Sequence, residues 1–345
     1  MQEILKLQKK IIPELVELLE KRYNILSTIY YNQPIGRRIL ANKLNLGERV
    51  VRTEINFFKE QGLIEVHTPG MTITKSGEEV VNELKDFIHD IRGLSEVEEQ
   101  VRTLLNIKKV IIVPGDIEKD SEIVKDLGKA SAKYLREIIK DDSIIALTGG
   151  STIKEVVEAF PKTNFSNVLV VPARGGMGKN VETQSNTLAA SLAKKVNGTY
   201  KMLHIPENLS DDIIETISKE KNISEVAECI RKADILLYGI GNAKHMAEKR
   251  GAEDSEIIKL IELGAIGEAF GCYFNKEGRV VFRAAVVGLD VDEAKKVKTH
   301  IAVAGGKNKV DSIISTQLNN SNSILVTDEA AGKEIVRILS KDIKY

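Results

Sequence analysis

Glycines, hydroxyls and basic side chains follow several apolar segments in the second half of this sequence, a combination suited to holding phosphate. The segment LTGGST, residues 147–152, comes directly after a run of strand-forming residues. Glycines there let the backbone approach an anion, amides at the start of the next helix point toward it, and two hydroxyls add donors. No lysine follows at the Walker spacing, so this is not the phosphate loop of a nucleoside triphosphatase. We predict that Gly149, Gly150, Ser151 and Thr152 bind a phosphate group.

Polar residues after other apolar segments fit the same kind of ligand. Arg174 follows a strand-like segment within VVPARGGMGKNVETQSN, and arginine suits bidentate phosphate recognition. Gln184 comes near the start of the next helix, and Lys309 follows the glycine pair of IAVAGGKNKVDSI. Glu268, among glycines in LGAIGEAFG, could accept hydrogen bonds from sugar hydroxyls. Each residue alone would be an ordinary solvated side chain, and their convergence at one sheet edge is what favours a site.

The segment YGIGNAKH, residues 238–245, resembles part of a dinucleotide fingerprint but is incomplete. Gly239 and Gly241 are present, and the third glycine is missing, so the evidence for a nicotinamide cofactor is weak. His245 has no partner acid nearby in the sequence, and a capping or packing role is the commoner one for such a histidine. The sequence therefore predicts no catalytic residue, no metal site and no cofactor.

The elements that must position these residues form an α/β domain. Short apolar runs alternate with helical patterns from about residue 110 onward, which is typical of a doubly wound, mostly parallel sheet. A longer and less buried strand is expected at Val280–Val287, which carries Arg283. The expected buried strands are Val110–Val113, Ile144–Leu147, Val168–Val171, Ile235–Tyr238, His300–Val303 and Ile324–Val326.

The first hundred residues predict a second module built from helices and one hairpin. Residues 35–77 follow the order of a winged helix-turn-helix: a short helix, a tight turn, a longer helix and a two-stranded wing. We expect Ile39 and Leu40 of the short helix to point inward. The expected elements are the helices Ile35–Lys43 and Glu48–Gln61, the second burying Val51, Ile55 and Phe58, and a hairpin of Leu63–His67 and Met71–Thr74.

The outer face of the longer helix carries side chains that can bind DNA. Arg49, Arg52, Thr53 and Asn56 lie at positions i, i+3, i+4 and i+7 and so form one stripe. Arginine suits guanine, asparagine suits adenine, and threonine suits a phosphate or a thymine methyl group. The residues expected to grip the DNA backbone are Arg37, Arg38 and Lys43. A solvated face and a protein-docking module are the alternatives, but the helix-turn-helix order, the wing and the stripe occur together.

The chain length of 345 residues favours two domains. We expect a winged-helix domain at 1–90 with a helical linker running to about 106, and an effector-binding and oligomerisation domain at 91–345. The linker, Ser76–Asn106, carries an apolar stripe of Val80, Leu84, Phe87 and Ile91 that could pack on its own chain or form a dimer contact.

Composition restricts the remaining possibilities. Fifty basic and fifty acidic residues give no net formal charge, so any DNA-binding surface must be local. The two cysteines, Cys229 and Cys272, form no metal-ligand pattern, and no apolar run is long enough for a bilayer. We expect a soluble cytoplasmic protein with no membrane partner.

The motifs together resemble the SorC/DeoR type of transcriptional regulator. LTGGST, PARGGMGKNVETQSN, GIGNAKH, LGAIGEAFGCYFN and VAGGKNKVDSI carry this resemblance across most of the second domain. It implies a fold similar to sugar-phosphate isomerases and glucosamine-6-phosphate deaminases, used to sense a phosphosugar. In the branch that controls glycolytic genes, which this sequence resembles most, the effector is fructose-1,6-bisphosphate. Effector binding there weakens the cooperative binding of a tetramer, a dimer of dimers, to double-stranded operator DNA.

The resemblance also implies roles for individual residues. The LTGGST turn would hold one phosphate with Lys309 nearby, Arg174 and Gln184 would contact the ligand, and Glu268 would bind sugar hydroxyls. Arg250 is a candidate for the second phosphate. The related deaminases have an Asp-Gly-His segment where this chain has Ala243, Lys244 and His245, so the proton-transferring aspartate is missing. An active isomerase or deaminase with an accessory winged helix is the alternative that this departure disfavours.

Overall fold

The computed structural model describes residues 10–175, 180–205, 211–284, 287–289 and 291–342. The chain divides into two compact units, each described here by itself. One comprises Met1–Glu96 with Lys119–Glu122, and the other comprises Val97–Glu118 with Ile123–Tyr345. Helix α6, Leu94–Leu105, spans the change from one unit to the other. No helix in the described ranges is both long enough and apolar enough to cross a membrane.

The first unit is a winged helix-turn-helix, as the sequence predicts. Pro13 occupies the first turn of its long first helix, where a missing N–H leaves no hydrogen bond unmade. The wing is an antiparallel pair in which Ile64 lies opposite Ile73. The elements are α2 (Pro13–Asn32), α3 (Arg37–Leu44), α4 (Glu48–Glu60), β1 (Ile64–His67), β2 (Gly70–Ile73) and α5 (Lys75–Ile91).

The core of this unit confirms most of the predicted inward residues and corrects one. Val51, Ile55 and Phe58 of α4 are buried, as is Leu40 of α3. Ile39 is 58% exposed, so its predicted inward orientation is wrong. The inward face of α3 is formed by Leu40, Ala41 and Leu44, and a residue one step before Leu40 lies about 100° around the helix from it.

Helix α5 packs on its own chain through part of the predicted stripe. Ile88 and Ile91 are buried against Val16, Leu19 and Tyr23 of α2, with Phe87 beside them. Val80 and Leu84 are half-buried, because the most buried line of α5 runs instead through Gly77, Val81, Ile88 and Ile91.

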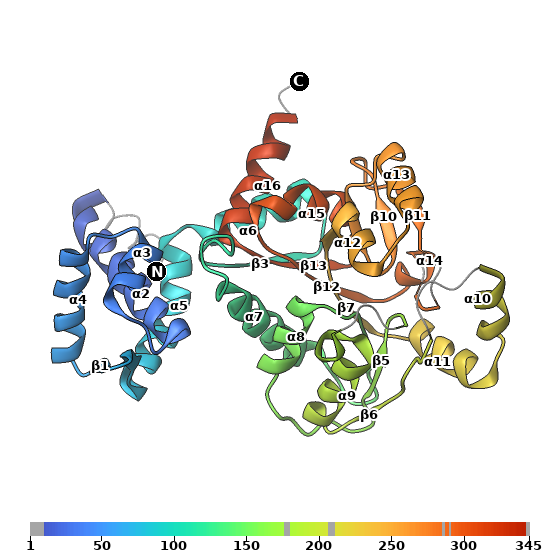
Figure 1. The fold of residues 1–345 in the computed structure, drawn as a ribbon, viewed down its shortest axis with the longest axis horizontal. Coiled ribbons are helices and arrows are strands. Elements are labelled where there is room, and N and C mark those ends of the chain that lie inside the picture. The colour runs from blue at the N-terminus through green and yellow to red at the C-terminus, as the bar shows by residue number, and fades with distance from the viewer. Residues whose placement is uncertain (1–9, 176–179, 206–210, 285–286, 290, 343–345) are drawn as a thin grey trace. The chain divides into compact units, whose positions relative to one another are not determined.

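The second unit is built on a parallel sheet with the strand order β3-β13-β12-β7-β4-β5-β6 (Figure 1). Each strand pairs with its neighbours in parallel, which confirms the predicted doubly wound sheet. The short edge strand β6 has no counterpart among the predicted segments. The strands are β3 (Lys109–Val113), β4 (Ile144–Leu147), β5 (Leu169–Pro172), β6 (Thr199–Tyr200), β7 (Ile235–Gly239), β12 (Thr299–Val303) and β13 (Ser323–Asp328).

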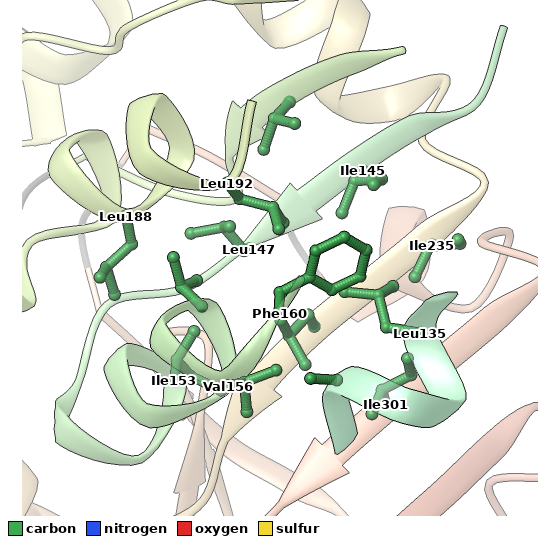
Figure 2. Close-up of a cluster of buried hydrophobic side chains, with 14 of the residues drawn as sticks. Leu135, Ile145, Leu147, Ile153, Val156, Phe160, Leu188, Leu192, Ile235 and Ile301 are labelled. Carbon is green, nitrogen blue, oxygen red and sulfur yellow. The ribbon is translucent and has the colours of Figure 1, made fainter. Parts of the chain in front are cut away.

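Helices cover both faces of this sheet, and α7, α8 and α9 pack together on one of them. Figure 2 shows Phe160 at the centre of that packing, surrounded by Leu135 of α7, Leu192 of α9 and Ile145 of β4. Because both faces are covered, the central strands carry continuous apolar runs such as Ile144–Leu147 and Ile235–Leu237. The helices are α7 (Ile123–Ile138), α8 (Ser151–Ala159), α9 (Ser185–Val196), α10 (Asp211–Ser218), α11 (Lys221–Arg231), α12 (Ala243–Arg250), α13 (Asp254–Glu262), α14 (Val291–Ala294), α15 (Val310–Gln317) and α16 (Glu329–Asp342).

A small antiparallel sheet, which the sequence does not reveal, lies beside the main one. Its order is β11-β10-β9-β8, and its strands have two to four residues, too few to show an alternating pattern. The expected strand at Val280–Val287 is the origin of β11, but β11 ends at Arg283, and residues 285 and 286 lie outside the described residues. The strands are β8 (Gly241–Asn242), β9 (Gly267–Ala269), β10 (Cys272–Phe274) and β11 (Val280–Arg283).

Close packing between α5 and the wing generates a stability prediction at Gly77. A Cβ at this position would lie 2.2 Å from the carbonyl oxygen of Leu63 and 2.6 Å from Cγ1 of Ile73. We therefore expect Gly77→Ala to lower the free energy of unfolding of the first unit by about 1–3 kcal/mol, the usual cost of overpacking. Urea unfolding followed by circular dichroism measures the change. Gly36→Ala is the matched control, since a Cβ on Gly36 meets open space, and equal effects of the two substitutions would contradict the packing argument.

Candidate functional site

A cavity of about 540 Å³ opens at the carboxyl ends of the parallel strands. It lies beside the neighbouring strands β4 and β7. After β4 the chain adds β5 on one side of this pair, and after β7 it adds β12 on the other side. Ligands usually bind at such a point of reversal in a parallel sheet. The described residues that line it are Thr148, Gly149, Gly150, Ser151, Thr152, Ile153, Arg174, Gly175, Ser185, Gly239, Ile240, Gly241, Asn242, His245, Met246, Lys249, Glu268, Phe270, Asn308 and Lys309. Most of the predicted effector residues are thus brought together.

The turn after β4 has the geometry of an anion site. Gly150 has φ +120°, a backbone conformation that residues with a Cβ rarely adopt, and it directly precedes α8. A Cβ on Gly149 would lie 2.6 Å from the carbonyl oxygen of Thr183, so only glycine fits. The first amides of α8 have no acceptor within the helix and point toward the cavity end, beside the hydroxyls of Ser151 and Thr152.

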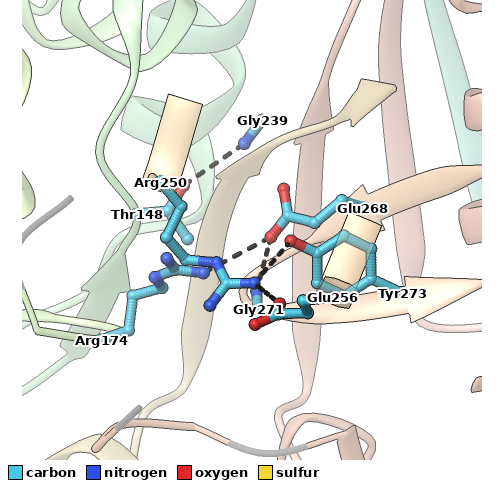
Figure 3. Close-up of polar contacts among 8 residues, drawn as sticks. All are labelled: Thr148, Arg174, Gly239, Arg250, Glu256, Glu268, Gly271 and Tyr273. Carbon is cyan, nitrogen blue, oxygen red and sulfur yellow. Dashed lines mark hydrogen bonds and ion pairs between the residues drawn. The ribbon is translucent and has the colours of Figure 1, made fainter. Parts of the chain in front are cut away.

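Neighbouring segments fix this turn in place. The N–H of Gly150 donates to the carbonyl oxygen of Thr183 over 2.8 Å. The N–H of Thr148 donates to the carbonyl oxygen of Leu237, and the N–H of Gly239 donates to Thr148 Oγ1 (Figure 3). The end of β4 is therefore bonded to β7 and to the segment before α9, which holds the turn ready for a ligand.

A buried ion pair joins the two sheets at the wall of the cavity. Arg174 follows β5, and its Nη1 lies 3.4 Å from Oε1 of Glu268 in β9 (Figure 3). The same carboxylate oxygen accepts the N–H of Gly271 over 2.6 Å. Burial raises the pKa of Glu268, an effect that the charge of Arg174 and the Gly271 hydrogen bond oppose. Arg174 and Glu268 both line the cavity, so the pair places guanidinium donors and a carboxylate acceptor at its wall.

Arg250, the predicted contact for a second phosphate, does not line the cavity. It is 9% exposed, its Nη2 forms an ion pair with Glu256, and it lies 3.3 Å from the hydroxyl of Tyr273 (Figure 3). The preceding residue, Lys249, lines the cavity instead. The cation at this wall of the cavity is therefore Lys249, the residue before the predicted Arg250.

Lys249 lies on a face of α12 that sequence reasoning missed. Asn242, His245, Met246 and Lys249, at i, i+3, i+4 and i+7, all line the cavity. Asn242 caps the helix by accepting the N–H of His245. The helical spacing counted from this cap could have identified the face. Position 249, four residues after His245, shares its face, and position 250 does not.

Lys309 lines the same cavity and is half-buried. Burial lowers the pKa of Lys309, and the nearby charge of Lys249 lowers it further. Within the described part of the chain, neither ammonium group has a hydrogen-bond or ion-pair partner. Two like charges facing one cavity form a strong attraction for an anion.

Two carboxylates, one buried and one exposed, hold the turn that carries Lys309. Asp328, fully buried at the end of β13, accepts the N–H groups of Gly306 and Ile117 over 3.0 and 2.9 Å. Glu118 accepts the N–H of Asn308 over 2.7 Å. These acids are absent from the predicted site because they act on backbone amides, a role that leaves no spacing pattern in the sequence.

The remaining predicted positions have different outcomes. Gln184 occupies the N-cap position of α9 without a capping hydrogen bond from its side chain and is half-buried, but the described lining includes its neighbour Ser185 instead. Residues 176–179 of the glycine-rich loop lie outside the described residues. Ala243, at the position of the missing aspartate, is 1% exposed. Glu268 is the sole carboxylate among the described residues that line the cavity, and it is committed to Arg174.

The winged helix presents the predicted DNA-binding residues on its surface. Thr53 donates its hydroxyl to the carbonyl oxygen of Arg49, so its methyl group is the part left to face a partner. Arg38 lies 3.5 Å from Glu48, which connects the starts of α3 and α4. The exposed residues are Arg37, Arg38, Lys43, Arg49, Arg52, Thr53 and Asn56.

Glu54, on the inner face of α4, is a buried acid with a structural role that the sequence did not reveal. It is 5% exposed and accepts from Lys21 over 2.7 Å and from Arg22 over 2.9 Å, both on α2. The Arg22 guanidinium also lies 3.7 Å from the ring centre of Phe57. Burial alone would raise the pKa of Glu54, but the hydrogen bonds and charges of Lys21 and Arg22 lower it. This cluster fixes the orientation of the helix that carries the exposed arginines.

The fold and the two sites together define a transcriptional regulator with a DNA-binding domain and a sugar-binding domain. Residues 18–88 match the family described as "CggR N-terminal DNA binding domain", and residues 89–337 match the family described as "Putative sugar-binding domain". The chain is 40% identical to the central glycolytic genes regulator of Priestia megaterium and 39% identical to that of Bacillus subtilis, in each case over 98% of this chain and 99% of the relative. The chain belongs to this family of glycolytic gene regulators, within the SorC type.

Solved structures agree with this placement. A SorC family transcriptional regulator from Enterococcus faecalis is 33% identical and superposes with a TM-score of 0.65, over 70% of this chain and 99% of that one. The full-length sorbitol operon regulator SorC from Klebsiella pneumoniae is 18% identical, with a TM-score of 0.67 over 90% of this chain and 96% of that one, a likeness in fold. The family places the chain among regulators rather than enzymes.

The Glu54 cluster predicts a dependence of stability on pH. The folded-state pKa of Glu54 is lowered, so its contribution is present above the unfolded-state value near 4.5 and is lost as pH falls through the folded-state pKa. We expect Glu54→Gln to destabilise the first unit by about 1–3 kcal/mol at pH 7 and by progressively less as pH falls below 4.5 toward and through the folded-state pKa. Urea unfolding at pH 7 and at a series of pH values below 4.5 tests this. The control is Glu60→Gln, an exposed position on the same helix, and a deficit that did not depend on pH would refute the charged role.

Proposed function

We propose that this protein is a repressor of glycolytic genes whose operator binding is weakened by a sugar bisphosphate, with fructose-1,6-bisphosphate as the effector. The observation that carries the proposal is the set of chemical groups that line one cavity. A helix-capped phosphate turn, a buried arginine–glutamate pair and two lysines without partners among the described residues all face it. Relatives named as central glycolytic genes regulators support the choice of gene class.

The distribution of charge in the cavity favours a ligand with two anionic groups. Gly149–Thr152 would bind one phosphate through helix amides and hydroxyls. Lys249 would bind the other, the role that the sequence suggested for Arg250, and Lys309, which the sequence placed near the first phosphate, would contribute to it as well. Arg174 and Glu268 would hydrogen-bond the sugar hydroxyls. With Ala243 at the position of the missing aspartate and Glu268 paired, the site favours binding over proton transfer.

The winged helix would bind double-stranded operator DNA with α4 in the major groove. Arg49, Arg52, Thr53 and Asn56 would contact bases, and Arg37, Arg38 and Lys43 would contact phosphates. We further propose a homotetramer built as a dimer of dimers in the cytoplasm. The effector can weaken DNA binding only if it binds the DNA-competent and DNA-incompetent assemblies with different affinities.

Ligand-dependent release of DNA is the central test. A duplex selected by this protein from a random-sequence library serves as the operator, and fluorescence anisotropy measures its binding. We expect fructose-1,6-bisphosphate to lower the affinity or the cooperativity of binding, because a ligand that favours one assembly depletes the other. Unchanged binding at millimolar fructose-1,6-bisphosphate would refute the proposed effector response.

The DNA face is tested with the double substitution Arg49→Ala and Arg52→Ala. Each good base contact contributes roughly 1–3 kcal/mol, so we expect the pair of losses to abolish specific binding. The control is Lys219→Ala with Lys232→Ala, which removes the same charge from exposed sites on the second unit. Anisotropy titrations with the selected duplex and with a scrambled one separate specific from general binding, and specific binding by the double variant would exclude α4 as the reading helix.

The second anion subsite is tested with Lys249→Met. A charge-assisted hydrogen bond contributes about 1.5–3 kcal/mol, so we expect at least a tenfold loss of affinity for fructose-1,6-bisphosphate and little change for fructose-6-phosphate. Isothermal titration calorimetry with both ligands measures this. Lys244→Met is the matched control, since Lys244 lies on the same helix, is exposed and does not line the cavity. Equal losses for the two ligands would place Lys249 outside the second subsite.

A further inference from the structure

The tip of the β9–β10 hairpin has an unusual backbone conformation. Ala269 pairs with Cys272, so the connecting turn consists of Phe270 and Gly271 alone. Both have positive φ, +41° and +89°, as in the mirror-image turns that two-residue hairpins favour. Asparagine or glycine is the ordinary residue at the first position of such a turn. A phenylalanine there is an outlier, since its Cβ crowds the following carbonyl.

Buried neighbours hold Phe270 in this conformation. Its ring meets that of Tyr238 edge-on at 5.2 Å between centroids. Tyr238 is itself fixed, because Gln317 donates to its hydroxyl over 3.0 Å and Ser323 donates to Gln317, and all three residues are at most 1% exposed. The N–H of Gly271 is bound by Glu268. The strain is therefore supported by a rigid, hydrogen-bonded base.

Phe270 itself is half-buried and lines the effector cavity. With Ile153, Ile240 and Met246 it supplies the apolar part of a wall that is otherwise made of glycines, hydroxyls and charged groups. Strained residues that are supported by their surroundings are concentrated at functional sites, because the conformation places a group where an unstrained residue would not. A flat apolar ring facing an anion site contributes nothing to binding phosphate.

We propose that Phe270 is a specificity-determining residue that selects a carbon skeleton between the anionic groups of the ligand. Its ring covers the C–H face of a phosphorylated sugar and removes apolar surface from water, a gain that a carbon-free anion does not obtain. This inference rests on the proposed function, since it names the selectivity of the same cavity. It separates recognition of the sugar from recognition of its phosphates.

The test compares two probes, fructose-1,6-bisphosphate and inorganic pyrophosphate, on the full-length chain. The variant Phe270→Asn removes the ring and accepts a positive φ without strain. We expect its affinity for fructose-1,6-bisphosphate to fall at least tenfold and its affinity for pyrophosphate to stay within twofold of the wild-type value. Isothermal titration calorimetry measures both. Phe282→Leu is the control, an aromatic residue of the same small sheet that does not line the cavity, and it should leave both affinities unchanged.

The outcomes separate the inference from the proposal on which it depends. If the wild-type protein binds neither probe, the proposed anion site fails, and the inference fails with it. If the wild-type protein binds both and Phe270→Asn keeps the preference for the sugar bisphosphate, or weakens both ligands equally, the inference alone is overturned. If Phe270→Asn does not fold, as judged by circular dichroism, the same two affinities are measured for Phe270→Leu instead. It keeps apolar bulk but lacks the flat face, so a several-fold loss for the sugar ligand alone supports the inference and wild-type selectivity overturns it.

Discussion

The buried ion pair between Arg174 and Glu268 is the constraint on which the second unit depends. Both side chains are almost fully removed from water, and an unpaired charge in that position would be strongly destabilising. Arg174 follows β5 of the parallel sheet and Glu268 lies in β9 of the small antiparallel sheet, so the pair also sets how the two sheets meet. Glu268 binds the N–H of Gly271 as well, and the same carboxylate therefore fixes the hairpin tip that bears Phe270.

The rest of the cavity follows from the need to hold backbone groups and cations at one sheet edge. Gly149 and Gly150 let α8 present its amides, and Asp328 and Glu118 bind the amides of the turn before Lys309. Both acids accept backbone N–H groups and so position the turn that carries Lys309. Lys249 and Lys309 both line the cavity, and the charge of Asp328 opposes the effect of Lys249 on the pKa of Lys309.

The sequence predicted the parts of this structure that depend on local patterns. Buried parallel strands leave continuous apolar runs, and a helix face leaves a repeat of three and four, so the main sheet, the winged helix and the LTGGST turn could be foreseen. The small sheet could not, because its strands are too short to alternate. Arg250 does not line the cavity, because a step of one residue turns a side chain about 100° around a helix, away from the face that Lys249 shares with His245. The roles of Glu54, Asp328 and Phe270 depend on partners far away in the sequence, and no local pattern encodes them.

Two positions explain why such a cavity suits a regulator: the carboxylate of Glu268 is paired, and Ala243 has no ionisable group. Proton transfer requires an acid or base free to change its charge at the reacting atom, and Glu268, the carboxylate of the described lining, is held by a guanidinium and an amide. At Ala243 no ionisable group is available. Charges that are fixed in this way can still distinguish ligands by shape and charge. The free energy of that discrimination is then available to shift an equilibrium between assemblies, which is the physical requirement for a molecular switch.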